Sequence, residues 1–272
     1  YNFYINLRKV REMRYGMCMG IDSPQNVKTA KDAGFDYMEC GFSLLSRADE
    51  EMFEKFKAAL EESNIKCEAA NCFLPGDLPI INHDYRSRKY VDYIEKGMTR
   101  GKQIGLEVIV FGSSAARSVP EGTSFAEGFR QLGDFLKSVV SPLAEKYGMT
   151  VVIEPLRKNE TNMINTVKEG TMLAVLSEND NIACLADLYH MVDDSNDDIR
   201  QLKGSIKHAH FSNPSSTNGL KRGFPKSFDE YDYQAFIDAL KYAGCERCSV
   251  EAKCIDYSTE AFEAGNLIKQ LK

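Results

Sequence analysis

FAEGFRQLGDFLKSVVSPLAEKYGMTVVIE, residues 125–154, contains the unit on which the predicted fold is built. Apolar residues recur three or four positions apart through most of this stretch, which is the spacing of one buried helix face. Gly148 follows, and glycine commonly ends a helix because it accepts left-handed backbone angles. Residues Thr150–Glu154 are β-prone and apolar up to the final acid. The stretch therefore predicts a helix, a tight turn and a buried strand.

The same unit recurs along the chain. Helical spacing is found again in MFEKFKAALEES (52–63), YVDYIEKGMTRGKQIG (90–105) and YQAFIDALKYAG (233–244). Glycine ends four of the predicted helices, at Gly34, Gly105, Gly148 and Gly244. The β-prone runs are Tyr15–Met19, Phe35–Cys40, Cys67–Cys72, Glu107–Phe111, Thr150–Glu154, Ile182–Asp187, Ser205–Phe211 and Cys248–Glu251. The alternation predicts an α/β fold with eight strand–helix units.

Eight such units in 272 residues match the size of a closed (β/α)8 TIM barrel. An open doubly wound sheet is the alternative, and it would be expected to carry a Gly-rich turn after its first strand. The residues there, GIDSPQN (20–26), do not form a GxGxxG loop. We therefore predict a single barrel domain over residues 1–272, with residues 1–14 as an N-terminal arm.

Composition narrows the functional classes. The longest apolar runs fall far short of the ~20 residues that a membrane span needs. With 34 Lys and Arg against 40 Asp and Glu, the net charge of −6 argues against a nucleic-acid partner. The N-terminal residues carry charges where an export signal would be apolar, and most of the eight cysteines lie in short apolar runs. We expect reduced thiols and a cytoplasmic protein.

The predicted loops differ in length. The long ones follow strands three, four, five and seven, whereas the connections from helix to strand are short. In a barrel, the loops after the strands surround the catalytic mouth. One end of the molecule is therefore expected to carry the chemistry.

Four successive strands end in potential metal ligands. Glu154 stands before the proline of VVIEP, and Asp187 is the last residue of IACLAD. His210 lies near the end of IKHAHF, and Glu251 is the fourth residue of CSVEA. Adjacent strand ends of a barrel converge, and three carboxylates packed together would repel each other without a cation. Three carboxylates and one imidazole suit a hard divalent ion. We expect Mn²⁺, with Mg²⁺ or Co²⁺ also suitable and Zn²⁺ less so.

Helix capping is the simpler explanation for such acids. Asp187 could cap the helix that follows, since aspartate is a favoured N-cap residue. Glu154 precedes Pro155 at the end of an apolar strand, and capping explains it poorly. His208, two residues before His210, lies one layer deeper in the barrel, and we expect a hydrogen-bonded structural residue there rather than a second metal ligand.

The chain resembles the sugar phosphate isomerase/epimerase family with the xylose isomerase-like barrel, which includes ketose 3-epimerases and hydroxypyruvate isomerases. The resemblance covers essentially the whole chain and rests on IEPL, ADLYH, HAH and SVEA, together with FGSSAARSVPEG and EPLRKNETN. It implies that the metal is held by Glu154, Asp187, His210 and Glu251. It also implies substrate contacts from Glu160, six residues after the first ligand, and from His190, three residues after the aspartate.

One position departs from the family pattern. The ketose epimerases carry an arginine six residues beyond the metal histidine, where this chain has Ser216. The nearest basic pair is Lys221–Arg222 in a longer loop, and we expect Arg222 to contact the substrate. Arg117 and Arg157 are also predicted in mouth loops, where an arginine can hold a phosphate or a carboxylate.

These observations together predict a divalent-metal-dependent isomerase or epimerase of a keto-sugar or sugar phosphate. Glu154 and Glu251 would move the proton next to the carbonyl, with a metal-stabilised enediolate between the two steps. The alternative is a metal-dependent lyase that uses the same proton abstraction for a β-elimination. An endonuclease with a three-zinc cluster would need more histidines than the four present. We expect a small carbohydrate substrate and a homo-dimer or homo-tetramer.

Overall fold

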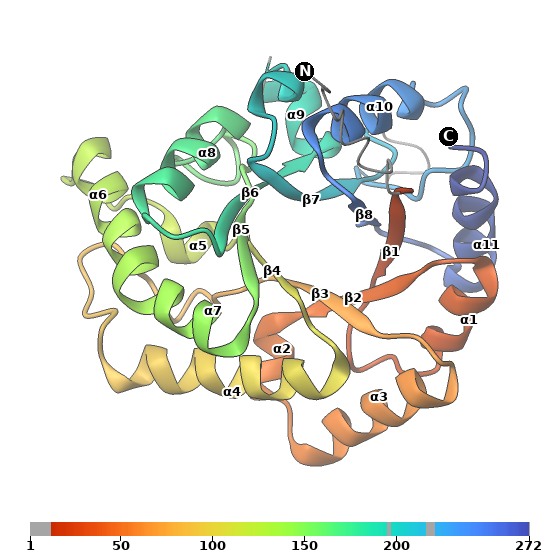
Figure 1. The fold of residues 1–272 in the computed structure, drawn as a ribbon, viewed down its shortest axis with the longest axis horizontal. Helices are drawn as coiled ribbons and strands as arrows, with labels where there is room; N and C mark the ends of the chain where they lie inside the picture. The colour runs from red at the N-terminus through yellow and green to blue at the C-terminus, as the bar shows by residue number, and fades with distance from the viewer. Residues whose placement is uncertain (1–11, 195–196, 216–220, 272) are drawn as a thin grey trace, which may run out of the picture.

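Eight parallel strands close into a barrel in the order β1 to β8 (Figure 1). The computed structural model describes residues 12–194, 197–215 and 221–271. The strands are β1 Arg14–Cys18, β2 Tyr37–Gly41, β3 Cys67–Asn71, β4 Val108–Phe111, β5 Thr150–Ile153, β6 Ile182–Asp187, β7 Ile206–Phe211 and β8 Arg247–Val250. Because β1 pairs with both β2 and β8, the sheet has no edge. The predicted (β/α)8 barrel is confirmed.

Helices surround the barrel on its outside (Figure 1). The helices are α1 Asn26–Ala33, α2 Phe42–Arg47, α3 Glu50–Glu62, α4 Arg88–Ile104, α5 Ser114–Arg117, α6 Phe125–Phe135, α7 Ser141–Tyr147, α8 Val167–Leu176, α9 Leu188–Asp194, α10 Tyr233–Ala243 and α11 Tyr257–Ile268, with a 3₁₀ turn at Ile199–Leu202. Within the described residues, no helix combines the length and apolar character needed to cross a membrane. The four helices that were predicted to end at a glycine do so, and each of these glycines has a positive φ.

The helix predicted within residues 125–147 is interrupted. A π-helical segment, Leu136–Val140, lies between α6 and α7. Pro142 stands at the start of α7 and has no N–H to donate to the carbonyl of Ser138. Its ring would also crowd that carbonyl, so the preceding turn widens. The periodicity predicted the helix correctly, but the proline changes the hydrogen bonding inside it.

The strand boundaries lie within two residues of the predicted ones, and β6 has the predicted bounds. β1 begins at Arg14, which pairs with Arg247, so the predicted arm 1–14 extends one residue too far. Residues 1–11 of that arm lie outside the described residues. Glu154 and Glu251 each stand one position after their strand rather than at its last residue. Phe35 precedes β2 and packs in the core without joining the sheet.

The core has two layers. Large apolar side chains between the strands and the helices form the outer layer, and seven buried residues fill the barrel: Tyr37, Ala69, Val108, Val110, Val152, Ala183 and Leu185. The long connections 72–87, 112–124, 154–166 and 212–232 all follow the carboxyl ends of strands, as predicted. The seven buried residues inside the barrel are called the apolar plug below. They form the floor of the barrel mouth, which the described parts of these four connections surround.

Candidate active site

Strand pleating places the polar cluster directly above the apolar plug. Residues two apart on a strand face the same side, so the position two beyond each plug residue lies one layer closer to the mouth. Glu154 stands two positions after Val152, and Asp187 two after Leu185. His210 on β7 pairs in register with Asp187, and Glu251 directly follows the last residue of β8.

The structure brings the four predicted metal ligands together. One ligand atom from each of Glu154, Asp187, His210 and Glu251 lies within 4.8 Å of all the others. The Nδ1 atom of His210 is 3.1 Å from Glu154 Oε1 and 2.9 Å from Glu251 Oε2. Three oxygen donors and one imidazole nitrogen, largely buried and converging on one point, fit a hard divalent cation.

Charge in this cluster is unevenly distributed. Burial raises the pKa of the Glu154 carboxyl. Burial would also raise the pKa of Glu251, but the nearby Arg222 and His210 outweigh it and lower that pKa. For His210, burial is outweighed by Glu39 and Glu251, which raise its pKa well above the usual value. The two glutamates are therefore driven toward opposite protonation states.

His190 and Glu160 lie beside this cluster. The His190 ring is buried, and its Nδ1 accepts a hydrogen bond from the backbone N–H of Arg157 at 3.3 Å. Its Nε2 is 3.5 Å from Asp187 Oδ2, and Glu160 Oε1 lies 3.8 Å from Nδ1. Burial lowers the pKa of His190 to about 4, so the ring is neutral near pH 7. Nε2 therefore carries a proton that can be donated.

Arg222 reaches the cluster from the connection after β7. Its Nη2 donates to Asp187 Oδ2 and to Glu251 Oε2, the latter at 2.5 Å, while its Nε donates to the Glu251 backbone carbonyl at 2.8 Å. The adjacent Lys221 is exposed. Ser216, where the resembled epimerases have arginine, lies outside the described residues.

A cavity of about 300 Å³ opens above these residues. Its lining includes Glu154, Glu160, His190, Arg222 and Glu251, together with residues at or after the ends of β2, β3 and β4. Among these are Asn71, Cys72, Pro75 and Ser113. All the sequence-predicted catalytic and substrate-contact residues therefore border one space.

Other predicted candidates lie elsewhere. Arg117 is fully buried and donates to the backbone carbonyls of Phe111 and Ile164, so it does not hold a ligand at the mouth as suggested from sequence. Burial lowers its pKa to about 10. Arg157 lies over the Tyr189 ring, with its Cζ 3.6 Å from the ring centroid, and donates to the Tyr189 carbonyl.

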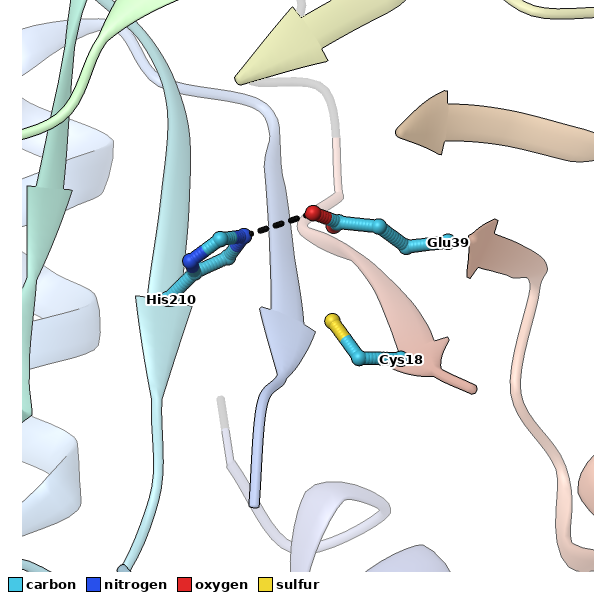
Figure 2. A group of neighbouring side chains, drawn as sticks. All are labelled: Cys18, Glu39 and His210. Carbon is cyan, nitrogen blue, oxygen red and sulfur yellow. Dashed lines mark hydrogen bonds and ion pairs between the residues drawn. The ribbon is translucent and has the colours of Figure 1, made fainter. Parts of the chain in front are cut away.

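Sequence reasoning missed two polar residues of the barrel interior. Glu39 on β2 is fully buried, and its Oε1 lies 2.8 Å from His210 Nε2 (Figure 2). Asn71 at the end of β3 donates from Nδ2 to Glu251 Oε1 at 2.9 Å. Glu39 could have been recognised from the sequence, because it is a charged residue in a predicted strand that is otherwise apolar, two positions after Tyr37. His208 donates to the second oxygen of Glu39, and so has the hydrogen-bonded role expected of it.

Known structures share this architecture. The L-ribulose 3-epimerase structure has a TM-score of 0.78 and 20% identity, over 95% of this chain and 94% of that one. D-psicose 3-epimerase in the presence of D-fructose has a TM-score of 0.77 and 13% identity, over 95% and 98%. The 3-keto-D-glucoside 4-epimerase YcjR from E. coli, in its apo form, has a TM-score of 0.75 and 19% identity, over 95% and 100%. At these identities the similarity shows a shared fold.

Sequence comparison reaches the family level. No curated protein sequence matches the chain significantly. The family model described as the xylose isomerase-like TIM barrel matches residues 27–271, from α1 to the end of the described chain. Since that match spans nearly every strand and helix around the cavity, the chain belongs to the xylose isomerase-like TIM barrel family.

Proposed function

We propose that this protein is a divalent-metal-dependent epimerase or isomerase that moves a proton next to the carbonyl of a keto-sugar. The observation that carries the proposal is the arrangement of Glu154 and Glu251. They come from opposite sides of the β6–β7 pair, and both approach the Nδ1 atom of His210. Two carboxylates over one prospective cation site, beside a cavity, form an arrangement suited to proton transfer. The epimerase names of similar structures support the same class.

Glu154, Asp187, His210 and Glu251 are proposed to hold the ion. Mn²⁺ is our first expectation, followed by Mg²⁺ and Co²⁺, because oxygen donors dominate the set. The bound ion supplies Lewis acidity at the carbonyl oxygen, which makes the neighbouring C–H easier to deprotonate. Zn²⁺ is less suited, since no thiolate belongs to the cluster of four.

The protein groups are proposed to handle the proton. Asn71 and Arg222 hold Glu251 in place and favour its ionised form, so that it can accept a proton from carbon. Glu154, which reaches the site from the other side of the β6–β7 pair, is proposed to return one to carbon. Return to the same carbon from the other face gives epimerisation, and return to the neighbouring carbon gives isomerisation. His190 Nε2 and Arg222 are the proposed donors to substrate oxygens.

The cavity favours an uncharged sugar over a sugar phosphate. Among the described residues, its lining includes the carboxyl groups of Glu154, Glu160 and Glu251 and one guanidinium. That guanidinium, of Arg222, already donates to two carboxylates. The proposed ion would offset Glu154 and Glu251, but Glu160 would still repel a phosphate dianion, and Arg222 is already engaged by carboxylates. A volume of about 300 Å³ also suits a substrate the size of a monosaccharide.

Solvent exchange in D₂O tests this function. The Mg²⁺-loaded protein would be incubated with ketoses, aldoses, keto-glycosides and their phosphates, and deuterium incorporation followed by NMR. We expect one carbon of one uncharged substrate to exchange, and the exchange to fall by about 10²-fold or more in Glu154→Gln and in Glu251→Gln. The product separates epimerase from isomerase, and loss of a leaving group would identify the lyase alternative.

Glu68→Gln is the matched control. Glu68 is another buried strand carboxylate, but it pairs with Arg14 at the opposite end of the barrel. The control should retain exchange. If exchange persists in both active-site glutamine variants, or is absent from every sugar despite bound metal, the proposed chemistry is wrong.

A further inference from the structure

Glu39 is a buried carboxylate that the proposed reaction does not use. It is fully shielded from solvent and lies on β2, whereas the prospective metal ligands come from β5 to β8. Figure 2 shows its side chain extending across the barrel toward the His210 ring. Its two oxygens lie 2.8 Å from His210 Nε2 and 2.8 Å from His208 Nε2. Such a group costs free energy to bury unless it is paired, and here each oxygen has its own partner.

This pairing determines where the protons of both imidazoles lie. An ionised carboxylate only accepts hydrogen bonds, so the Nε2 atoms of His208 and His210 must both be protonated. The Nδ1 atom of His208 has no partner among the described residues, as expected for a neutral ring with its lone pair there. The Nδ1 atom of His210 is the one that faces Glu154 and Glu251. Deprotonation of that ring therefore leaves a lone pair directed at the carboxylate cluster.

We propose that Glu39 is a positioning residue, which keeps His210 in the Nε2–H tautomer and presents Nδ1 to a metal ion at the cluster. The inference rests on the proposed metal-dependent function and adds to it a residue from the far side of the barrel. Carboxylates that hold a ligating histidine in this way typically change metal affinity by about 10- to 100-fold when they are removed. The contact joins residues 171 positions apart and spans the barrel interior.

Cys18 raises a competing interpretation. Its Sγ, a Glu39 oxygen and a His210 nitrogen lie within 4.8 Å of one another, which suggests a second metal site (Figure 2). An ion there would have to displace the Nε2 proton of His210 and break the Glu39 contact. Burial also raises the pKa of the Cys18 thiol well above its usual value, so the thiolate that a metal needs is disfavoured. The hydrogen-bonded interpretation satisfies Glu39 without an ion.

Glu39→Gln is the decisive variant. Glutamine offers one acceptor and one donor where glutamate offers two acceptors, so one of the two imidazoles must change its tautomer. We expect Mn²⁺ to bind about 10- to 100-fold more weakly by calorimetry. We also expect ¹⁵N-histidine NMR of the Mg²⁺-loaded chain, which has only four histidines, to show loss of the uniform Nε2–H state of His210.

Two controls separate positioning from simple packing. His208→Gln keeps a donor toward Glu39 and should bind Mn²⁺ like the native chain. Glu68→Gln removes a buried carboxylate from the neighbouring strand and should also leave metal affinity unchanged. If Glu39→Gln fails to fold, Glu39→Asp takes its place, since it retains the charge on a shorter side chain. Its affinity for Mn²⁺ should lie between that of the native protein and that of a non-binding variant.

Each outcome decides the inference. Native metal affinity in Glu39→Gln or in Glu39→Asp overturns it, as does an Nδ1–H tautomer of His210 in the native chain. If the native chain binds no divalent ion, the proposed function fails separately. The NMR comparison of metal-free native and Glu39→Gln chains then judges the contact by itself, because loss of the Glu39 charge beside Nε2 should change the Nε2 chemical shift, and an unchanged His210 spectrum refutes it.

Discussion

Arg222 contributes a positive charge at the place where the proposed metal ion would be held. Its Nη2 contacts Asp187 and Glu251, two of the prospective metal ligands, and its guanidinium lies 4.8 Å above the Tyr189 ring centroid. Nearby opposite charges stabilise ionised carboxylates, which explains part of the lowered pKa of Glu251. A divalent ion and this guanidinium therefore compete for the same oxygens.

Replacing Arg222 with methionine should tighten metal binding. Loss of a positive charge a few ångströms from the site removes a repulsion, and we expect the Kd for Mn²⁺ to fall about tenfold. The metal-free protein should become less stable, because Asp187 and Glu251 lose their counter-charge. Calorimetry gives the first quantity, and thermal unfolding in EDTA gives the second.

Arg157→Met is the matched control for this experiment. Arg157 also lies over Tyr189, but its guanidinium donates to a backbone carbonyl rather than to a prospective ligand. We expect a clearly smaller change in Mn²⁺ affinity. An Arg222→Met variant that binds Mn²⁺ no better than the native chain would contradict the competition described above.

Among the elements, α8 shows how a local sequence signal supports the site. Thr166 and Glu169 form a reciprocal capping box at the start of this helix. The Thr166 hydroxyl accepts from the Glu169 N–H at 3.1 Å, and Glu169 Oε2 accepts from the Thr166 N–H at 3.2 Å. The helix follows the connection that carries Glu154 and Glu160 and packs on β5 and β6. Its first turn therefore fixes one end of that connection.

Thr166→Ala should cost about 1 kcal/mol of the free energy of unfolding, because the Glu169 N–H loses its acceptor. Glu169→Gln retains an acceptor and should change stability by less than half as much. Urea unfolding followed by circular dichroism measures both variants. Equal stability of Thr166→Ala and the native chain would show that water replaces the cap without cost.

At the scale of the whole molecule, the first and last helices close the ring. α1 and α11 lie side by side, beside the β1–β8 pair that completes the barrel (Figure 1). Gly265 on α11 faces the end of α1, where an added Cβ would lie 2.2 Å from the backbone oxygen of Ala33. Backbone cannot rotate away as a side chain can. The close approach of the two helices therefore depends on glycine at this position.

Gly265→Ala should destabilise the protein by about 1–3 kcal/mol, as overpacking does, although alanine is the better helix former by roughly 1 kcal/mol. Gly133→Ala in α6 is the control. An added Cβ there meets mainly Leu176, a partly exposed side chain that can rotate away. Urea unfolding should leave Gly133→Ala near native stability. A Gly265→Ala chain as stable as that control would show that α11 moves freely.

Local patterns predicted much of the architecture. The spacing of apolar residues and the glycines that end helices identified the eight strands, with boundaries within two residues of those in the structure. They could do so because backbone geometry repeats over short distances. The positions of Glu154, Asp187, His210 and Glu251 near strand ends predicted a shared site, since parallel strands present those ends to one mouth. The π-helical turn before Pro142 was missed, although its cause is a single local residue.

The sequence by itself determined the alternation of strands and helices, the side of the barrel on which the candidate site lies, and four of the groups at its mouth. Only the tertiary structure decided the Glu39–His210 contact, the burial of Arg117 and the approach of Arg222 to Asp187 and Glu251. The physical reason is distance along the chain. Strand pleating is local, but which side chains meet inside a closed barrel depends on the register of all eight strands and on the paths of long loops.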